Sequence, residues 1–300
     1  MKNFADRLLG AVEDRRSHVV VGLDPDYSLL PPELRTLVPS QVADADALAE
    51  CFDVFLRGIL GAVAGIAVAV KPQLAYFEAL GSAGYGLYER IVAEAREQGF
   101  LVIADAKRGD IGSTAEAYAR AHLDVVGADA VTVNPWFGTD GIEPFILRTK
   151  DDGRGLFVLV KTSNPGSAEI QDLVLAAGGS PVFEHVAGLV DTWGVDAVGE
   201  CGYSSVGAVV GATHPEQAAR LRVAHPTTPF LVPGFGAQGA GPSQLSGIFD
   251  AGGTGAVVNS SRAILYAYRA RGGDWRAAAR DEAEEMRRAL WAVAHGGGES

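Results

Sequence analysis

The chain is poor in cysteine: Cys51 and Cys201 are the two such residues among its 300. Neither lies in a C-x-x-C pair or beside a histidine, so the pattern indicates neither a disulfide framework nor a thiolate metal site. We expect both to be reduced residues of the core. The six histidines are scattered and show no H-x-H or H-E-x-x-H spacing. We therefore expect no metal site built on histidine.

Positive charge is also in deficit. The chain has 25 Lys and Arg against 37 Asp and Glu, which gives a formal net charge of −12 at pH 7. A protein that binds nucleic acid needs a basic face to neutralise phosphates. The charge balance therefore argues against a nucleic-acid partner. A small acidic ligand could still bind, but only through a local basic site.

Long apolar runs are missing as well. The longest, residues 58–70, falls well short of the roughly 18 residues that indicate a membrane span. The first residues, "MKNFADRLLGAVEDRRSH", mix both charges among apolar positions and contain no signal-peptide core. We expect a cytoplasmic protein with no membrane partner.

Glycine, in contrast, is abundant at 38 residues, and 48% of the chain is hydrophobic. Eight short apolar runs, each ending in a polar or glycine-containing tail, predict buried strands. They cover residues 18–24, 67–73, 100–107, 130–135, 156–163, 196–202, 229–234 and 256–261.

Helical patterns lie between these runs. One of them places six apolar residues on a single helix face, namely Leu48, Phe52, Phe55, Leu56, Ile59 and Val63. Eight alternations of strand and helix are typical of a (β/α)8 TIM barrel, an α/β fold whose active site lies at the carboxyl ends of the strands. A doubly wound open sheet is the main alternative, because periodicity does not show whether a sheet closes.

The alternation predicts one catalytic domain over residues 1–300, with flanking helices at the N-terminus and near Trp275–Val293. The longest insertion, Asn164–Pro181, is expected to be a mobile loop. Residues 295–300, "HGGGES", are expected to be a frayed tail.

The third predicted strand ends in an unusual concentration of charge, "FLVIADAKRGDIGST" over residues 100–114. Side chains alternate along a strand, so Asp105 and Lys107 should share one side and face the barrel mouth. Asp110 lies beyond the strand and must reach sideways, to a substrate or to a neighbouring subunit. Asp24 and Lys71 end the first two strands and add to this set.

Two structural readings compete with an active site: an ion-pair cluster that closes the barrel, or a set of solvated loop charges. Buried charges carry a desolvation cost that apolar residues avoid, so the set as a whole favours a functional site. A lysine flanked by carboxylates should stay protonated. Lys107 is therefore better suited to donate a proton than to form a Schiff base.

These residues resemble a known family. "DAKRGDIGST" is similar to the D-x-K-x-x-D-I signature of orotidine 5'-monophosphate decarboxylases. Further motifs of that family occur in order, each at a predicted strand end: "VGLDP" at Asp24, "VKP" at Lys71, "KTSNPG" at Ser163, "VPGFGAQG" at Gln238 and "NSSRAI" at Arg262. The resemblance covers nearly the whole chain, and the long loop after Ser163 is similar to that of the larger bacterial subgroup.

The resemblance implies an activity. Orotidine 5'-monophosphate would lose its carboxylate as carbon dioxide, and Lys107 would protonate the remaining carbanion to give uridine 5'-monophosphate, with no cofactor. Lys71, Asp105 and Lys107 would form a charged network, completed by Asp110 from the partner of a homodimer. Asp105 would lie near the departing carboxylate, either repelling it or orienting Lys107.

The same resemblance implies substrate contacts. Asp24 and Lys71 would hold the ribose hydroxyls, and Thr114 would join Asp110 from the second chain. Ser163 would bind the pyrimidine edge. The remaining expected substrate-binding residues are Pro233, Gln238 and Arg262.

The stretch "GFGAQG", residues 234–239, also matches the G-x-G-x-x-G pattern of dinucleotide-binding folds. That reading expects an acidic residue about 20 positions later, at the end of the next strand. The next strand ends in "NSSR" instead. A phosphate site built from the loops after strands seven and eight fits better, with Gln238 and Arg262 as donors.

Three rival functions stay open at this point. Related barrels with a D-x-K-x-x-D strand are magnesium-dependent decarboxylases or aldol-type synthases that act on sugar phosphates, and an acid ends their second strand where this chain has Lys71. A Schiff-base aldolase is disfavoured because Lys107 should stay charged. A barrel that only binds a nucleotide or a partner protein would leave the charged set unused.

Overall fold

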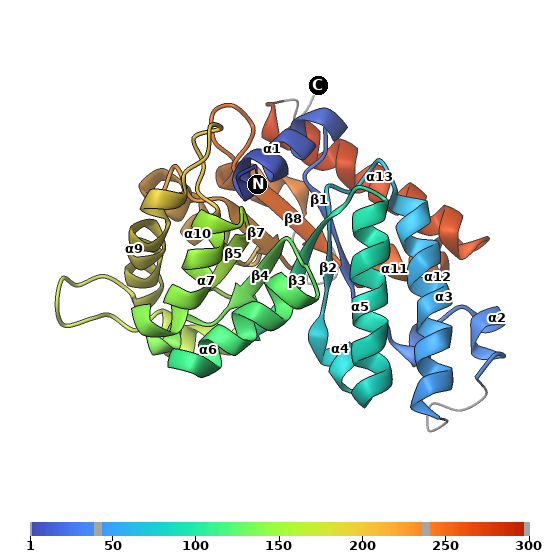
Figure 1. Cartoon of the computed structure of the whole chain (residues 1–300). Coiled ribbons are helices and arrows are strands. Elements are labelled where there is room, and N and C mark those ends of the chain that lie inside the picture. The colour runs from blue at the N-terminus through green and yellow to red at the C-terminus, as the bar shows by residue number, and fades with distance from the viewer. Residues whose placement is uncertain (1, 39–43, 236–240, 297–300) are drawn as a thin grey trace.

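The computed structural model describes residues 2–38, 44–235 and 241–296. Eight parallel strands form a closed barrel in chain order, with β8 paired to β1 (Figure 1). The strands are β1 (Val19–Leu23), β2 (Ala69–Pro72), β3 (Leu101–Arg108), β4 (Ala130–Val133), β5 (Gly155–Lys161), β6 (Val206–Val210), β7 (Phe230–Pro233) and β8 (Ala256–Ser260). The (β/α)8 barrel predicted from the alternating pattern is confirmed, and the open sheet is excluded.

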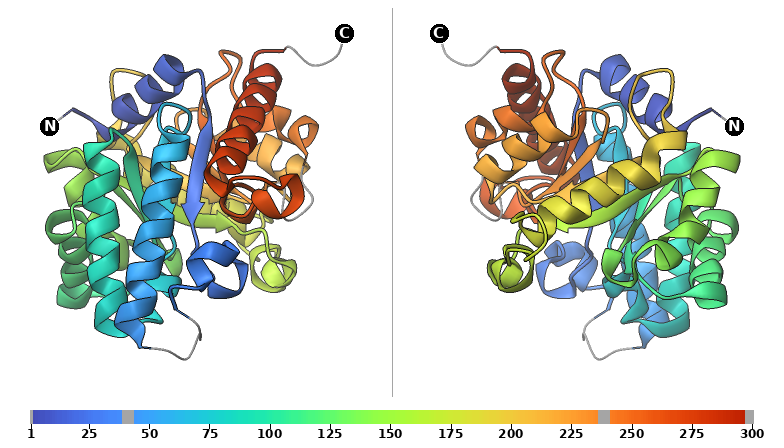
Figure 2. Two further views of the ribbon diagram at one scale, coloured as in Figure 1. Left: turned by 90° about the vertical axis from the view of Figure 1, so that its right-hand side faces the viewer. Right: turned by 90° about the vertical axis from the view of Figure 1, so that its left-hand side faces the viewer.

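Helices surround the barrel on its outer side (Figure 2). They are α1 (Phe4–Arg15), α2 (Pro32–Arg35), α3 (Ala45–Val63), α4 (Leu74–Glu78), α5 (Gly81–Glu97), α6 (Gly112–Ala119), α7 (Thr139–Asp151), α8 (Ala168–Gln171), α9 (Val182–Gly194), α10 (Pro215–Ala224), α11 (Arg262–Leu265), α12 (Tyr268–Arg271) and α13 (Trp275–Ala294). A π-helical turn, Arg120–Val125, extends α6. The predicted apolar face of α3 is buried.

The sixth strand was predicted at residues 196–202, and this prediction is wrong. β6 is Val206–Val210, all five residues of which are buried. Residues 196–197 instead end a 3-10 helical turn, and residues 198–202 form a turn that an isolated bridge between Val198 and Ser204 closes. Strands in a parallel barrel are covered on both sides, which requires an unbroken apolar run, and the run begins only after Tyr203.

The two cysteines lie in different surroundings. Cys51 is buried in the core on α3, as predicted, whereas Cys201 is exposed. The prediction of a core position for Cys201 is therefore wrong. Its backbone N–H donates to the carboxylate of Asp6 in α1, so this surface turn is held by the backbone rather than by apolar packing.

The first helix closes the end of the barrel where the strands begin (Figure 1). Its apolar residues pack against interior strand residues, which include Leu101, Ile103, Phe157, Val209, Leu231 and Val257. Phe4 is fully buried and meets Phe157 edge to face at 6.0 Å. A Cβ atom at Gly155 would lie 2.3 Å from the Phe4 ring, so β5 begins with the residue that leaves room for it.

Two further features of the fold are the length and polarity of its helices and a projecting segment after β5. Within the described residues, the helices are all too short or too polar to cross a membrane. The segment between β5 and α9 projects from the body of the molecule, at the left of Figure 1. This segment contains the loop Asn164–Pro181 that was expected to be mobile.

We predict that Phe4→Ala lowers the free energy of unfolding by about 3–5 kcal/mol, because a buried aromatic ring is removed and the barrel end cannot collapse fully. Urea denaturation followed by circular dichroism measures this loss. Leu147→Ala, at an exposed position of α7, should cost less than about 1 kcal/mol. Equal losses for the two variants would show that α1 does not stabilise the barrel as its packing indicates.

Candidate active site

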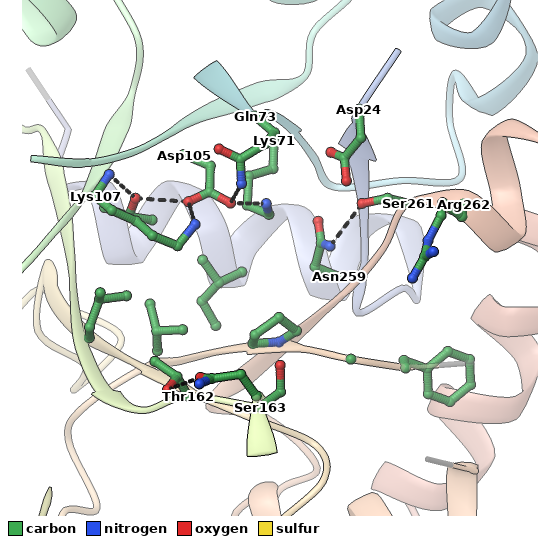
Figure 3. A pocket seen from close by; sticks show the side chains of 18 residues that line it. Asp24, Lys71, Gln73, Asp105, Lys107, Thr162, Ser163, Asn259, Ser261 and Arg262 are labelled. Carbon is green, nitrogen blue, oxygen red and sulfur yellow. Dashed lines mark hydrogen bonds and ion pairs between the residues drawn. The ribbon is translucent and has the colours of Figure 1, made fainter. Parts of the chain in front are cut away.

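A pocket of about 410 Å³ opens at the carboxyl ends of the strands. Leu159, Val209 and Leu231 form its apolar floor, directly above the interior packing of the barrel. Polar and charged residues from several different strand ends form its walls (Figure 3). The lining residues that were expected from the sequence are Asp24, Lys71, Asp105, Lys107, Ser163, Pro233 and Arg262.

Asp105 is the centre of the charged wall. Its Oδ2 pairs with the ammonium of Lys71 and accepts a hydrogen bond from Gln73 Nε2 at 3.0 Å. Its Oδ1 lies 2.5 Å from Lys107 Nζ and accepts from the Thr132 hydroxyl at 3.0 Å. Four donors from β2, β3, β4 and the β2–α4 junction thus converge on one carboxylate (Figure 3).

The environment fixes the charge of this centre. Burial favours the neutral acid, but Lys71 and Lys107 outweigh it and hold the pKa of the Asp105 carboxyl well below its usual range. Burial also opposes the charge of Lys71, yet Asp105 and Asp24 raise the pKa of Lys71 above its ordinary value. Asp105 is therefore an anion and Lys71 a cation at neutral pH, as a hydrogen-bonded buried pair requires.

Lys107 differs from Lys71 in its exposure. Its side chain is 44% exposed and lines the pocket, whereas the Lys71 side chain is 6% exposed. Leu101 and Ile103 face the barrel interior below Asp105, as the alternation predicts. Lys107 reaches the mouth by a different route, because its backbone is left-handed at φ 46° and the pairing of β3 with β4 shifts register here.

Asp24 lies on the opposite wall from Lys107 (Figure 3). Burial raises the pKa of the Asp24 carboxyl, and the charge of Lys71 opposes that rise. Its Oδ1 is buried without a hydrogen-bond partner. The Tyr266 hydroxyl donates to the Asp24 carbonyl at 2.9 Å and so fixes the turn that follows β1. A buried carboxylate oxygen without a donor is suited to accept from a ligand hydroxyl.

Arg262 begins α11 and lines the pocket at the end away from Lys107 (Figure 3). Pro233, at the end of β7, and the following Gly234 and Phe235 also line the pocket. Gln238, expected to bind substrate in the same turn, lies outside the described residues. The pocket thus has a basic side chain at each end, Lys107 and Arg262, with Asp24 and the apolar floor between them (Figure 3).

Ser163 follows β5 and lines the pocket together with Thr162 and Asn164. The Thr213 hydroxyl donates to the Ser163 carbonyl at 3.2 Å. The Thr162 hydroxyl donates to Asn164 Oδ1 at 2.7 Å. The turn is therefore held through its backbone and its flanking side chains.

Asp110 and Thr114 do not line this pocket. Asp110 accepts from the Ile111 amide at 2.8 Å, and Thr114 is exposed in the first turn of α6. Large apolar side chains are exposed on the same connection and on the turn after β4: Ile111 at 57%, Trp136 at 72% and Phe137 at 49%. The two residues expected to belong to the site therefore lie outside the pocket of their own chain.

Sequence reasoning missed several neutral residues of the pocket, among them Gln73, Thr132 and Asn259. Thr132 and Asn259 are each a polar residue near the end of a buried apolar strand, in "AVTV" and "AVVNS". That interruption was the available signal. Gln73 is two residues beyond Lys71 and could have been found by the same alternation.

The site has few groups that could hold a metal. Among the described residues, no group of three or more His, Cys, Asp and Glu gathers in a way that could bind an ion. The carboxylates of Asp24 and Asp105 both interact with the Lys71 ammonium, which competes with any cation for them. The arrangement is instead suited to an anionic organic ligand that meets a proton donor.

Comparison with known proteins agrees with this geometry. The model of the orotidine 5'-phosphate decarboxylase / HUMPS family matches residues 18–277. The chain is 44% identical over 276 residues to an orotidine 5'-phosphate decarboxylase of Rhodopirellula baltica, and the match covers 90% of each chain.

Solved structures give the same picture. The OMP decarboxylase of Leishmania donovani superposes with a TM-score of 0.75 at 32% identity, covering 97% of this chain and 99% of that one. The UMP synthase of the same organism matches with a TM-score of 0.78 and 32% identity over 97% of this chain, which spans 57% of that longer protein. From the family model and these relatives, we conclude that the chain belongs to the orotidine 5'-phosphate decarboxylase / HUMPS family.

Proposed function

We propose that the protein decarboxylates orotidine 5'-monophosphate to uridine 5'-monophosphate and carbon dioxide, without a cofactor, as the last step of de novo pyrimidine nucleotide synthesis. The observation that carries this proposal is the ionised Asp105 between Lys71 and Lys107, with Lys107 reaching the open pocket. Family membership and relatives named for this activity support it. The pocket volume of about 410 Å³ suits a ligand of nucleotide size.

The chemistry follows from the charges. The bond between C6 of the pyrimidine and its carboxylate breaks, carbon dioxide leaves, and the electron pair stays on C6. Lys107 donates a proton from Nζ to C6, which forms the C–H bond of the product and leaves a neutral amine that solvent reprotonates. Fixed positive charge near C6 stabilises the developing carbanion most where water is displaced.

Asp105 serves this step by holding Lys107. Its Oδ1 lies 2.5 Å from Lys107 Nζ, and its other oxygen is occupied by Lys71 and Gln73. An anion fixed in this way holds the Lys107 ammonium at the open side of the pocket. The distance between the Asp105 carboxylate and the substrate carboxylate decides whether repulsion between them also contributes to the decarboxylation.

The rest of the pocket orients the nucleotide. Asp24, with its unpaired buried oxygen, accepts from the ribose hydroxyls beside Lys71. Arg262 binds the phosphate at the far end, and Pro233 lines the same pocket. Gln238, which lies outside the described residues, is proposed as a further phosphate donor. Ser163 hydrogen-bonds the pyrimidine edge. These assignments place the carboxylate-bearing edge of the base next to Lys107.

The sugar-phosphate alternative fits the pocket less well. A magnesium-dependent decarboxylase or synthase needs carboxylates free to bind the ion. Here Lys71 occupies the second strand end and pairs with Asp105. Nothing in the geometry favours that alternative.

We further propose a homodimer in which Asp110 and Thr114 complete the partner's site. Both lie outside their own pocket, and the neighbouring connections after β3 and β4 expose Ile111, Trp136 and Phe137. An apolar surface of this kind is typical of an interface between copies. The same arrangement would bury Lys107, which is 44% exposed in the single chain.

We also propose that the protein acts in the cytoplasm. The free thiols of Cys51 and Cys201 suit a reducing compartment. Cell fractionation that recovers the protein with a cytosolic marker enzyme would support this location, and recovery in a secreted or membrane fraction would contradict it.

The loop Asn164–Pro181 is proposed to close over the bound nucleotide within a single-domain enzyme. Its base is tied down, because Asp172 pairs with the fully buried Lys161 at 2.7 Å and Gln171 accepts from the Thr162 amide at 2.9 Å. Beyond this base, Leu173 and Val174 are more than half exposed. Because the base of the loop is fixed, its exposed apolar segment can close over the bound nucleotide while the base stays in place.

The purified protein should convert orotidine 5'-monophosphate to uridine 5'-monophosphate with EDTA present throughout, as followed by the fall in substrate absorbance. Lys107→Ala should lower kcat by about 100- to 10,000-fold or more, because the proton donor is lost. Its binding of uridine 5'-monophosphate should be largely preserved.

Lys150→Ala is the matched control, since Lys150 pairs with Asp196 at the surface. An inactive wild-type protein that turns over a sugar phosphate when magnesium is added would refute the proposed reaction. Near-normal turnover by Lys107→Ala would refute the assigned donor alone.

The shared site predicts complementation between two inactive variants. Lys107→Ala and Asp110→Ala proteins should each be inactive, and an equal mixture should recover about a quarter of the wild-type activity. Random exchange makes half of the dimers hybrid, and one of the two sites in each hybrid keeps both residues. Mixing Lys107→Ala with the Lys107→Ala/Asp110→Ala double variant leaves no intact site and is the control. Absence of recovery after exchange has been verified by mass spectrometry would count against the shared site.

Loop closure predicts a change in hydrogen exchange. Amides of residues 164–181 should exchange more slowly when uridine 5'-monophosphate is bound, while those of α7 should not change. Mass spectrometry of the exchanged peptides measures both regions in one experiment. An identical exchange pattern with and without the nucleotide would show that the loop does not close on it.

A further inference from the structure

We propose that Thr132 is a positioning residue for the proton donor, because its buried hydroxyl holds both the backbone of Lys107 and the carboxylate of Asp105. This inference rests on the proposed function. Thr132 contacts the two residues from the neighbouring strand, β4, and is 1% exposed. It stands beside the charged centre without carrying a charge itself.

The backbone of Lys107 needs such a support. Lys107 has φ 46° and is one of two non-glycine residues with positive φ in the described part of the chain. Side chains other than glycine disfavour this region, so the surrounding structure must hold it. The conformation lies at the charged centre, where strain of this kind serves to aim a side chain.

The pairing of β3 with β4 explains how the support arises. Ala104 pairs with Val131, but Arg108 pairs with Val133, so β3 advances by four residues while β4 advances by two. A bulge of this kind frees backbone groups from the ladder and re-aims the side chain that it carries. The freed N–H of Lys107 donates to the Thr132 hydroxyl oxygen at 3.0 Å.

The same hydroxyl also fixes Asp105. A backbone N–H can only donate, so the Thr132 oxygen accepts from Lys107 and gives its single proton to Asp105 Oδ1 at 3.0 Å. That carboxylate oxygen lies 2.5 Å from Lys107 Nζ. Thr132 therefore closes a ring that joins the main chain of Lys107 to its own ammonium through Asp105.

Another buried threonine shows what a merely structural role looks like. Thr149 is 2% exposed, and its hydroxyl donates to the Ile146 carbonyl within its own helix, α7. It touches no group of the pocket. Thr149 is thus a matched control for the removal of a buried threonine hydroxyl.

The test is the steady-state kinetics of Thr132→Val, which keeps the shape of the side chain and removes the hydroxyl. We expect kcat for orotidine 5'-monophosphate to fall by about 10- to 100-fold, the effect of one or two misplaced hydrogen bonds. KM should change by less than about threefold, since Asp24 and Arg262 are untouched. Thr132→Ser should restore kcat to within about threefold, and Thr149→Val should leave it unchanged.

A crystal structure of Thr132→Val supplies a second readout. We expect the backbone of Lys107 to leave the left-handed region and its ammonium to move away from Asp105. Should Thr132→Val fail to fold, Thr132→Ala takes its place in both measurements, with urea denaturation verifying the folded state.

Three results would overturn the proposal: a kcat for Thr132→Val within about twofold of the wild type, no rescue by Thr132→Ser, or an unmoved Lys107 in the variant structure. A wild-type protein inactive on orotidine 5'-monophosphate would refute the proposed reaction instead. The variant structure would still decide the role of Thr132 in that case.

Discussion

The site depends on one interaction, the pairing of a buried carboxylate with two ammonium groups. Asp105 could not remain ionised at its depth without Lys71 and Lys107, which hold its pKa below the usual range against the effect of burial. Well-packed apolar residues at these positions would avoid the desolvation cost that the charged set carries. The network is therefore explained by chemistry at the pocket rather than by stability of the barrel.

The barrel limits the desolvation cost of this network by confining the charged side chains to one layer. Below Asp105, the interior side chains of β3 are Leu101 and Ile103, and α1 closes the opposite end with Phe4. The charged side chains therefore lie above packed apolar side chains, and they need no polar partner on that side. Parallel strands that end together bring Lys71, Asp105 and Thr132 from three strands to the same height, although the chain separates them by dozens of residues.

Much of this arrangement could be predicted from the sequence, for a physical reason. Strands buried on both sides must be continuously apolar, so seven of the eight predicted runs coincide with strands, and the charges at their ends mark the mouth. The sixth run was misplaced because residues 196–202 contain apolar residues but are interrupted by Gly199, Glu200 and Gly202. The true strand, Val206–Val210, is a short apolar run that follows the interrupted one.

The neutral members of the site could not be predicted in the same way. Thr132 and Asn259 are single polar residues in apolar strands, and such residues are often satisfied within the core. Only the register between β3 and β4 shows that Thr132 meets Lys107, and that register includes a bulge that no periodicity indicates. Tertiary pairing, not local pattern, decides which polar residue becomes part of a site.

The position of Lys107 also relates the pocket to the apolar surface beside it. In the proposed reaction, Lys107 rather than bulk water protonates the carbanion at C6, which requires the donor to be shielded when it acts. In the single chain its side chain is 44% exposed, and Asp110, on the connection that follows β3, lies outside the pocket. A second copy seated on Ile111, Trp136 and Phe137 would cover that opening and bring a carboxylate to it. In the proposed homodimer, shielding of the donor and completion of the charged network would be one structural event, with Asp110 and Ile111 on the β3–α6 connection and Trp136 and Phe137 on the turn after β4.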